Sequence, residues 1–178
     1  HGFGYSVFEH SSDGISSEVW VYVAMDAPAK FTSIRVKNRS GRPRRLSVTG
    51  YVEWVLGDLR PKTAMQVTTE IDPKTGAIFA RNPYATEFAD RTAFFDAGEA
   101  TRTVTGDRTE FLGRNGTLRS PDAMTRGRLS GRVGAALDPC AAIQVHFDLA
   151  DGQEREIIFR LGAGRNSDDA GNLVRRFR

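Results

Sequence analysis

The longest alternation of apolar and polar residues in the chain runs from Arg44 to Asp58. Its apolar positions recur at every second residue and are Leu46, Val48, Val52, Trp54 and Leu56, with Gly50 among them. A period of two predicts a β-strand, because successive side chains of a strand point to opposite faces of the sheet. One face of this central strand is therefore expected to be core. The other face carries Tyr51 and Glu53, which indicates either a ligand surface or an ordinary second layer.

Shorter alternating runs fill the rest of the chain, and turn residues separate them. They cover residues 3–8, 15–25, 30–38, 65–72, 77–81, 93–96, 101–105, 143–149 and 154–161. The first three are predicted to form an antiparallel meander, and residues 40–43 to turn the chain into the central strand. The last two are predicted to form a hairpin across Asp151 and Gly152. A pattern with many strands and short turns predicts an all-β fold, an antiparallel β-sandwich in a single domain over residues 1–178.

The end of the chain changes from a strand pattern to a helical one. Ser167, Asp168 and Asp169 form a cluster of helix-capping residues, and a helical stripe of Leu173, Val174 and Phe177 follows. A short C-terminal helix is predicted there. Since the chain begins at His1 without Met and stops at Arg178 within this helical pattern, we expect it to be a fragment of a larger multidomain protein.

Composition excludes several classes of protein. The 178 residues suit one domain with a substantial core. Because Cys140 is the single cysteine, an intrachain disulfide and a multi-cysteine zinc site are excluded, and a buried free thiol is expected. The longest apolar run, Val19 to Met25, is far shorter than the roughly 20 residues of a membrane-spanning helix, so the sequence predicts a soluble domain.

The charge of the chain does not indicate a nucleic-acid partner. The net charge is +3, yet the basic residues alternate along strands, follow turns or lie among 22 acidic residues. A nucleic-acid footprint would be a coherent basic face on a recognisable module, and no such module is present in the sequence.

No convincing catalytic or metal-binding set is present in the sequence. The three histidines, His1, His10 and His146, are not spaced as metal ligands, and no nucleophile elbow accompanies them. Carboxylates such as Glu53 and Glu110 could be paired for glycoside chemistry, but that mechanism depends on a separation that sequence does not give. We therefore predict no catalytic residue, no metal and no cofactor in this chain.

Two groups of residues have the chemistry to bind a sugar. Trp20, Tyr22 and Tyr51 share the non-core parity of strands predicted to be adjacent, with Glu18 and Glu53 beside them. Such rings could stack on the apolar C–H faces of sugars, while the carboxylates bind hydroxyls. The alternative is that the rings cover a hydrophobic surface between sheets or domains.

The second group is a long, glycine-containing segment, Gly106 to Pro121, which is predicted to be an irregular loop. Its candidate binding side chains are Arg108, Arg114, Asn115 and Arg119. Arginine offers several donors in a rigid fork, and asparagine both donates and accepts, so the set suits sugar hydroxyls or phosphate oxygens. The alternative is a solvated loop whose arginines form surface ion pairs.

Three segments in order resemble a known family. They are HGFGYSVFEHSSDGI at the start, NRSGRPRRLSVTGYVEWVLGD in the middle and GDRTEFLGRNGTLRSP later. They resemble the β-sandwich domain of cyclic β-(1,2)-glucan synthases, which is similar to the N-terminal domain of cellobiose, cellodextrin and chitobiose phosphorylases. The segments ARNPYATEFADR and LDPCAAIQVHFDLADGQEREIIFRLG agree with the synthases in particular.

The resemblance implies a supersandwich of the galactose-mutarotase type, followed in the parent by a linker helix and an (α/α)₆ barrel that carries the catalytic acid. It also implies that the chain starts partway into the sandwich, so that the earliest strands are absent and a sheet edge is open. The loop from Gly106 to Pro121 would reach toward the barrel. The parent would be a bacterial inner-membrane protein, with this domain on the cytoplasmic side.

The expected function is that of a noncatalytic carbohydrate-binding domain that helps position glucan for the adjacent barrel. The candidate sugar-binding residues are Arg114, Asn115, Arg119, Arg108, Trp20, Tyr51 and Glu53. The alternative is a structural or dimerisation module without sugar affinity, acting as a homodimer.

Overall fold

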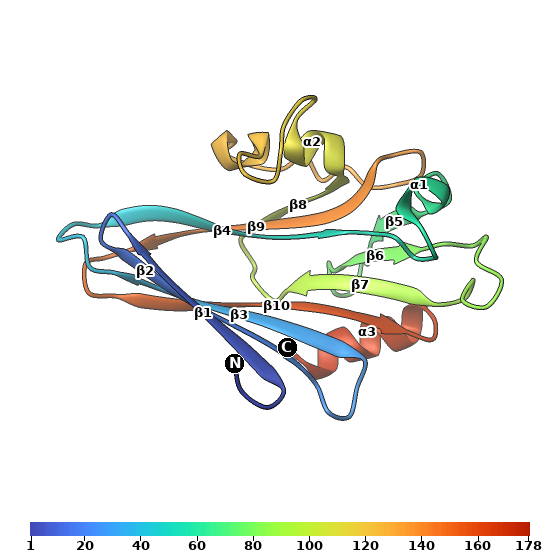
Figure 1. Ribbon diagram of the computed structural model, residues 1–178, viewed down its shortest axis with the longest axis horizontal. Coiled ribbons are helices and arrows are strands. Elements are labelled where there is room, and N and C mark those ends of the chain that lie inside the picture. Colours follow the sequence, from blue (N-terminus) through green and yellow to red (C-terminus); the bar gives the residue numbers. More distant parts are fainter.

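The computed structural model describes all residues, 1–178, and shows two antiparallel sheets stacked face to face (Figure 1). The large sheet has seven strands in the order β1 (Tyr5–Ser12), β2 (Ile15–Val23), β3 (Ala29–Asn38), β10 (Glu154–Gly164), β7 (Thr92–Ala97), β6 (Ile78–Arg81) and β5 (Thr68–Ile71). The small sheet has three, in the order β4 (Arg44–Glu53), β9 (Pro139–Leu149) and β8 (Arg102–Asp107). The predicted antiparallel sandwich is confirmed.

Four short helices complete the chain: α1 (Arg60–Thr63), α2 (Arg108–Leu112), the 3₁₀ helix η1 (Asp122–Thr125) and α3 (Ser167–Arg176). In Figure 1, α2 lies above the small sheet and α3 below the large one. The helix α3 confirms the predicted C-terminal helix, although Asn166 rather than Ser167 is its N-cap and accepts from the backbone N–H of Asp169. Val174 of α3 is fully buried, and the Phe177 ring packs edge-on against Phe31 of β3.

The main core fills the space between the two sheets. Its fifteen buried residues include Val145 and Phe147 from β9, with Phe95 of β7 stacked on Phe159 of β10 at 5.7 Å between ring centroids. Gly50 of β4 lies over this aromatic pair. A Cβ at Gly50 would come within 2.5 Å of the Phe159 ring and 2.8 Å of the Phe95 ring, so the sheets approach closely only because this residue has no side chain.

Two predicted turns are instead corners at which the chain passes from one sheet to the other. β1, β2 and β3 form the expected meander, but residues 39–43 then lead from the large sheet into β4 of the small one. The predicted hairpin of residues 143–149 with 154–161 is wrong, because β9 and β10 belong to different sheets. The buried Asn38 holds both corners, since its amide donates to the carbonyls of Arg42 (2.8 Å) and Leu149 (2.9 Å).

Three predicted strands are shorter than their patterns. The run of residues 15–25 ends at Val23 in β2, and Met25 beyond it is fully exposed. The central strand ends at Glu53 rather than Asp58, because Leu56 adopts a left-handed backbone (φ 42°) and α1 begins at Arg60. Trp54 nevertheless remains in the core. The run from Met65 forms a strand only from Thr68 to Ile71, since α1 and the turn after it occupy the residues before Val67 and leave Met65 exposed.

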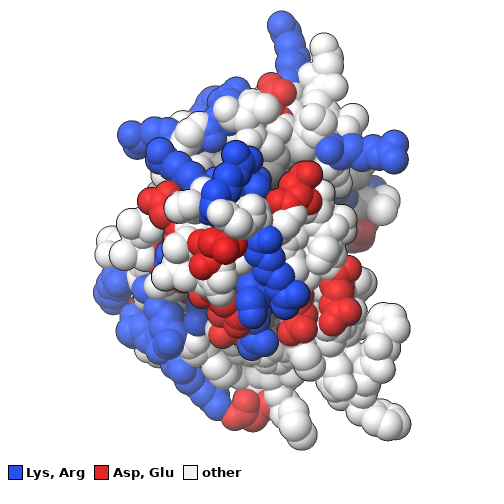
Figure 2. All heavy atoms as spheres, turned by 90° about the vertical axis from the view of Figure 1, so that its left-hand side faces the viewer, with Lys and Arg blue, Asp and Glu red and all other residues white.

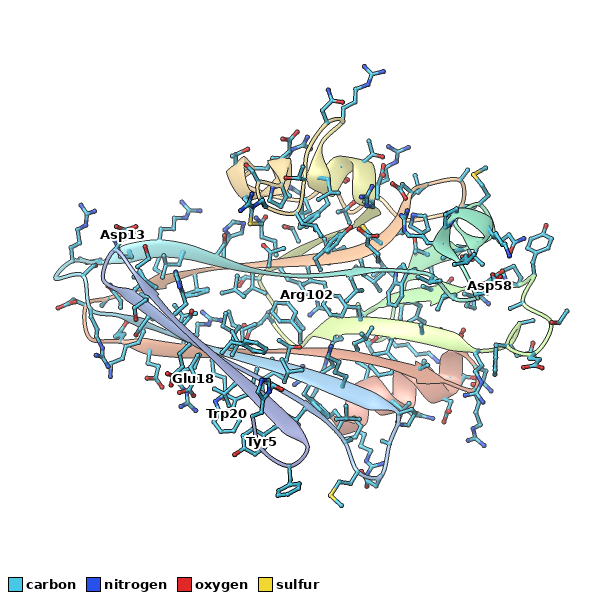
Figure 3. The ribbon with its side chains drawn as sticks, in the orientation of Figure 1. Tyr5, Asp13, Glu18, Trp20, Asp58 and Arg102 are labelled. Atoms are coloured by element: carbon cyan, nitrogen blue, oxygen red, sulfur yellow. The ribbon has the colours of Figure 1, made fainter.

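A buried carboxylate anchors α3 to the large sheet. Asp96 of β7 is fully buried and receives two hydrogen bonds from the Arg178 guanidinium, at 2.6 and 3.1 Å. Arg160 and Arg102 also lie within 4 Å of it, and burial lowers the pKa of both guanidinium groups. Arg102 comes from β8 of the small sheet and donates to the carbonyl oxygen of Ala97, so it joins the two sheets (Figure 3).

Gly50→Ala tests the close approach of the sheets. We expect it to destabilise the protein by about 1–3 kcal/mol, because the added methyl group forces Phe159 and Phe95 out of their packing. Urea unfolding measures the change. Gly127→Ala is the control, since a Cβ there meets nothing within 4 Å, and equal stability of the two variants would contradict the prediction.

Candidate functional site

The outer face of the small sheet carries a second layer made of α2, η1 and the segments between them. Phe111 and Leu112 of α2 pack with Ala123 and Leu129 against Ala142 of β9, forming a separate small core. The side chain of Asp107 begins α2 by accepting from the Thr109 backbone N–H at 3.0 Å. The predicted irregular loop from Gly106 to Pro121 therefore contains one ordered helix.

Tyr51 is covered by this layer. Its ring stacks on the Phe111 ring, with centroids 4.3 Å apart and planes 11° from parallel. Burial, followed by the hydrogen bond that its hydroxyl donates to Glu53 (2.7 Å), raises the pKa of Tyr51. The face with Tyr51 and Glu53 is thus a packed second layer, which was one of the two interpretations of its pattern.

Glu53 and Arg108 belong to a closed charge network under α2. Arg108 Nε donates to Glu53 Oε1 at 2.8 Å, and Arg108 Nη1 reaches Asp138 Oδ2 at 3.3 Å. Arg60 binds the same two carboxylates from α1. Burial by itself would raise the pKa of Glu53, but the hydrogen bonds from Tyr51 and Arg108 outweigh it and lower this pKa. Each guanidinium already has two carboxylate partners, so the network holds α1, α2 and the β4 end together.

The three remaining candidate sugar-binding residues of the loop have no protein partners. Arg114, Asn115 and Arg119 are exposed, and their side chains make no hydrogen bond or ion pair. The loop after α2 is the highest part of the molecule in Figure 1. Gly116 lets it fold back over α2, because a Cβ there would lie 1.6 Å from the Leu112 carbonyl oxygen. The structure therefore presents these three side chains on an anchored base.

Polar groups without partners lie on the same face of the small sheet. Thr49 Oγ1, Gln144 Oε1 and His146 Nε2 are buried and have no hydrogen-bond partner. Thr49 is opposite Gln144 in the β4–β9 pairing, and His146 is two residues further along β9. Buried polar groups normally have partners, so these atoms are suited to bridging water inside the domain.

Trp20 lies on the opposite side of the molecule from Tyr51. It is on the outer face of the large sheet, where Figure 3 shows it beside Tyr5 and Glu18. Its ring stacks on Tyr5 at 5.1 Å, and its indole N–H donates to Glu18 at 2.6 Å. The expectation of one aromatic surface from Trp20, Tyr22 and Tyr51 is wrong, because β2 and β4 are in different sheets. Six of the seven candidate sugar-binding residues lie on the side of the small sheet, and Trp20 lies on the side of the large sheet.

Comparison with known proteins identifies the fold and its family. Residues 1–178 match the family described as "Glycosyl hydrolase 94, supersandwich domain". The chain belongs to this family. It is similar to the cyclic beta-(1,2)-glucan synthase NdvB of Rhizobium meliloti (strain 1021), with 36% identity over 100% of this chain and 6% of that protein. It is also 26% identical to the N,N'-diacetylchitobiose phosphorylase of Vibrio furnissii, over 95% of this chain and 22% of the phosphorylase.

The supersandwich domain thus spans only a small part of these relatives, 6% of the synthase and 22% of the phosphorylase. Among solved structures, the polysaccharide lyase BACCELL_00875 superimposes with a TM-score of 0.55 and 9% identity, over 94% of this chain and 23% of the lyase. That likeness concerns the fold alone. The predicted family resemblance is confirmed.

The supersandwich domain has no cluster of side chains suited to hold a metal ion. None of its helices has the length and apolar character needed to cross a membrane. On the end shown in Figure 2, basic and acidic side chains are interspersed. Cys140 is a buried free thiol, as predicted, and burial raises its pKa.

Sequence reasoning did not identify one cleft at the end of the supersandwich domain. It has a volume of about 650 Å³ and lies among the residues after β4, around α1 and between β6 and β7. Tyr84 and Phe88 are exposed beside it, at 74% and 55%. The sequence contains one indication of this cleft, the two aromatic residues Tyr84 and Phe88 in the proline-containing segment ARNPYATEFADR. Above, that segment supports only the family resemblance.

Glu53→Gln tests the charge network through the pH dependence of stability. Because the pKa of Glu53 is lowered in the folded protein, the unfolded state binds more protons at acidic pH, and the Glu53 contribution falls as pH falls. Glu53 stabilises the folded state fully at pH values above its unfolded pKa of about 4.3. This stabilisation is lost as the pH falls toward the lower pKa of the folded state. Urea unfolding between about pH 5 and pH 3 should show a smaller loss of stability for the variant than for the wild type.

Glu9→Gln is the control for this measurement, since Glu9 is exposed and has no hydrogen-bond or ion-pair partner. Its stability should follow that of the wild type over the same pH range. If Glu53→Gln also did so, the network would not contribute to folding as described.

Proposed function

We propose that this supersandwich domain is a noncatalytic carbohydrate-binding domain that helps position glucan for an adjacent catalytic barrel. The observation that supports it most is the loop after α2, where Arg114, Asn115 and Arg119 are exposed without protein partners. Long loops on a rigid sandwich commonly carry binding groups, because the scaffold fixes the loop ends.

The chemistry of the loop suits a ligand rich in hydroxyl groups. Guanidinium groups donate in a fixed plane, and the Asn115 amide both donates and accepts, which matches the mixed character of hydroxyl groups. The charge network under α2 orders the base of the loop, so less conformational entropy is lost on binding than for an unanchored loop.

The identity of the parent protein is part of the proposal. The likeness to NdvB supports a cyclic β-(1,2)-glucan synthase, in which this domain is one part of a multidomain bacterial inner-membrane protein and lies on the cytoplasmic side. Its partners would be a glucan oligosaccharide or polysaccharide and the (α/α)₆ barrel of the same polypeptide. We propose no cofactor and no nucleic-acid partner.

The double variant Arg114→Ala and Asn115→Ala tests the loop in the full-length parent enzyme. Loss of about 1–2 kcal/mol of hydrogen bonding should weaken glucan binding roughly 5- to 30-fold and alter the chain-length distribution of the product. Arg39→Ala is the control, since Arg39 is exposed at the corner between β3 and β4. Product distributions equal to the wild type, with folding intact, would remove the loop from the mechanism.

Incubation of the 178-residue chain with β-(1,2)-glucan and inorganic phosphate tests the noncatalytic part of the proposal. We expect no glucose 1-phosphate, because the proposed catalytic acid belongs to the adjacent barrel. Release of glucose 1-phosphate by this chain would contradict the proposal.

A structural or dimerisation module is the second candidate, and a specific surface favours it. Large apolar side chains are exposed on β1, β2 and the turns beside them, namely Phe3, Tyr5, Phe8, Trp20, Tyr22, Val23 and Met25. β1 is also an edge strand, with a free row of backbone groups that can pair with another chain. Sedimentation of the chain with and without glucan separates the candidates, since a dimer that does not respond to glucan supports this second one.

A further inference from the structure

We infer that the cleft at the end of the sandwich is a second carbohydrate subsite, separate from the loop after α2. The inference rests on the proposed function for the class of ligand, a glucan chain, and assigns it a new site. The cleft volume of about 650 Å³ lies within the range of roughly 300–1,000 Å³ that ligand clefts occupy. Figure 1 shows α1 and the β6–β7 connection together at this end, and Figure 3 places Asp58 there.

The cleft walls are joined by one buried side chain. Asn82 is 4% exposed, and its amide nitrogen donates to the Leu56 carbonyl oxygen at 2.9 Å and to the Gln66 side-chain oxygen at 3.4 Å. Its side-chain oxygen accepts from the backbone N–H of Tyr84 at 3.0 Å. Leu56 has a left-handed backbone, which is unfavourable for a non-glycine residue and tends to persist at functional sites. Asn82 therefore joins the parts of the wall at Leu56, Gln66 and Tyr84 without a ligand.

The lining combines aromatic surfaces with free polar groups. Phe88 and Tyr84 are exposed rings, and the Arg91 guanidinium lies 5.4 Å from the Phe88 ring centroid. Neither Arg91 nor Glu87 has an ion-pair partner, and the Tyr84 hydroxyl makes no hydrogen bond. Aromatic faces stack on the apolar C–H face of a sugar ring, while donors and acceptors around them bind its hydroxyl rim.

The charge of the cleft favours a neutral ligand. Asp58 is already paired with Lys62 at 2.8 Å, which leaves one acidic and one basic side chain, Glu87 and Arg91, free in the lining. An anion would require an excess of positive charge, and an acidic residue in the site opposes it. A sugar needs no such excess, so a neutral saccharide fits better than a phosphate group.

The test titrates the 178-residue chain with linear β-(1,2)-gluco-oligosaccharides by calorimetry and by amide NMR. We expect binding, with the largest NMR shifts at residues 82–91, and we expect Phe88→Ala to weaken it about tenfold through the lost stacking surface. Tyr84→Ala should act in the same direction. Phe3→Ala is the matched control, because Phe3 is a fully exposed phenylalanine outside the cleft. Thermal unfolding of each variant confirms that the chain remains folded.

The outcomes separate this inference from the proposed function. If the loop variant Arg114→Ala/Asn115→Ala loses binding while Phe88→Ala and Tyr84→Ala retain it, the loop site stands and the cleft is overturned as a subsite. If only the cleft variants lose binding, the cleft stands and the loop does not bind. Absence of binding by the wild-type chain, or equal effects of Phe88→Ala and Phe3→Ala, would overturn the cleft assignment.

Discussion

The close approach of the two sheets at Gly50 is the constraint on which the rest of the structure depends. Without a side chain there, β4 lies directly on the stacked rings of Phe95 and Phe159, which belong to the main core between the sheets. Interiors are packed densely enough that one added methyl group is felt, so this contact fixes the spacing of the sheets. The position of β4 in turn determines where Tyr51 and Glu53 meet α2, and where the chain leaves for the end cleft.

Two networks of charged side chains attach the helices to the two sheets. On the small-sheet side, Glu53 and Asp138 share Arg60 and Arg108, which ties α1 and α2 to the sheet. On the large-sheet side, the buried Asp96 is surrounded by arginines and holds the end of α3. A buried carboxylate is tolerated only with such partners, since an unpaired charge away from water is very unfavourable. Both networks therefore serve to place helices on otherwise separate faces.

The side chains that we propose for sugar binding differ in whether protein partners already hold them. Arg108 and Glu53 bind each other in the charge network under α2. Arg114, Asn115 and Arg119 lie in the loop that follows α2 and have no protein partners. The end cleft is similar, since the buried Asn82 joins parts of its wall, while Glu87 and the Arg91–Phe88 pair are exposed. In both places side chains held by protein partners support exposed ones without hydrogen-bond or ion-pair partners, which is the order expected of the binding surfaces proposed above.

The sequence by itself determined where most strands lie, the core face of the central strand, the buried thiol of Cys140 and the C-terminal helix, because alternation and helix capping are local properties of the chain. Its quoted segments also indicated the family. The sequence did not determine which sheet each strand joins, since a turn such as residues 150–153 has the same residues whether it closes a hairpin or crosses between sheets. Only the tertiary contacts of Asn38 decide that these turns are corners. For the same reason Arg108 and Arg114 were equivalent in sequence, and only the folded positions of Glu53 and Asp138 made one of them structural and left the other free.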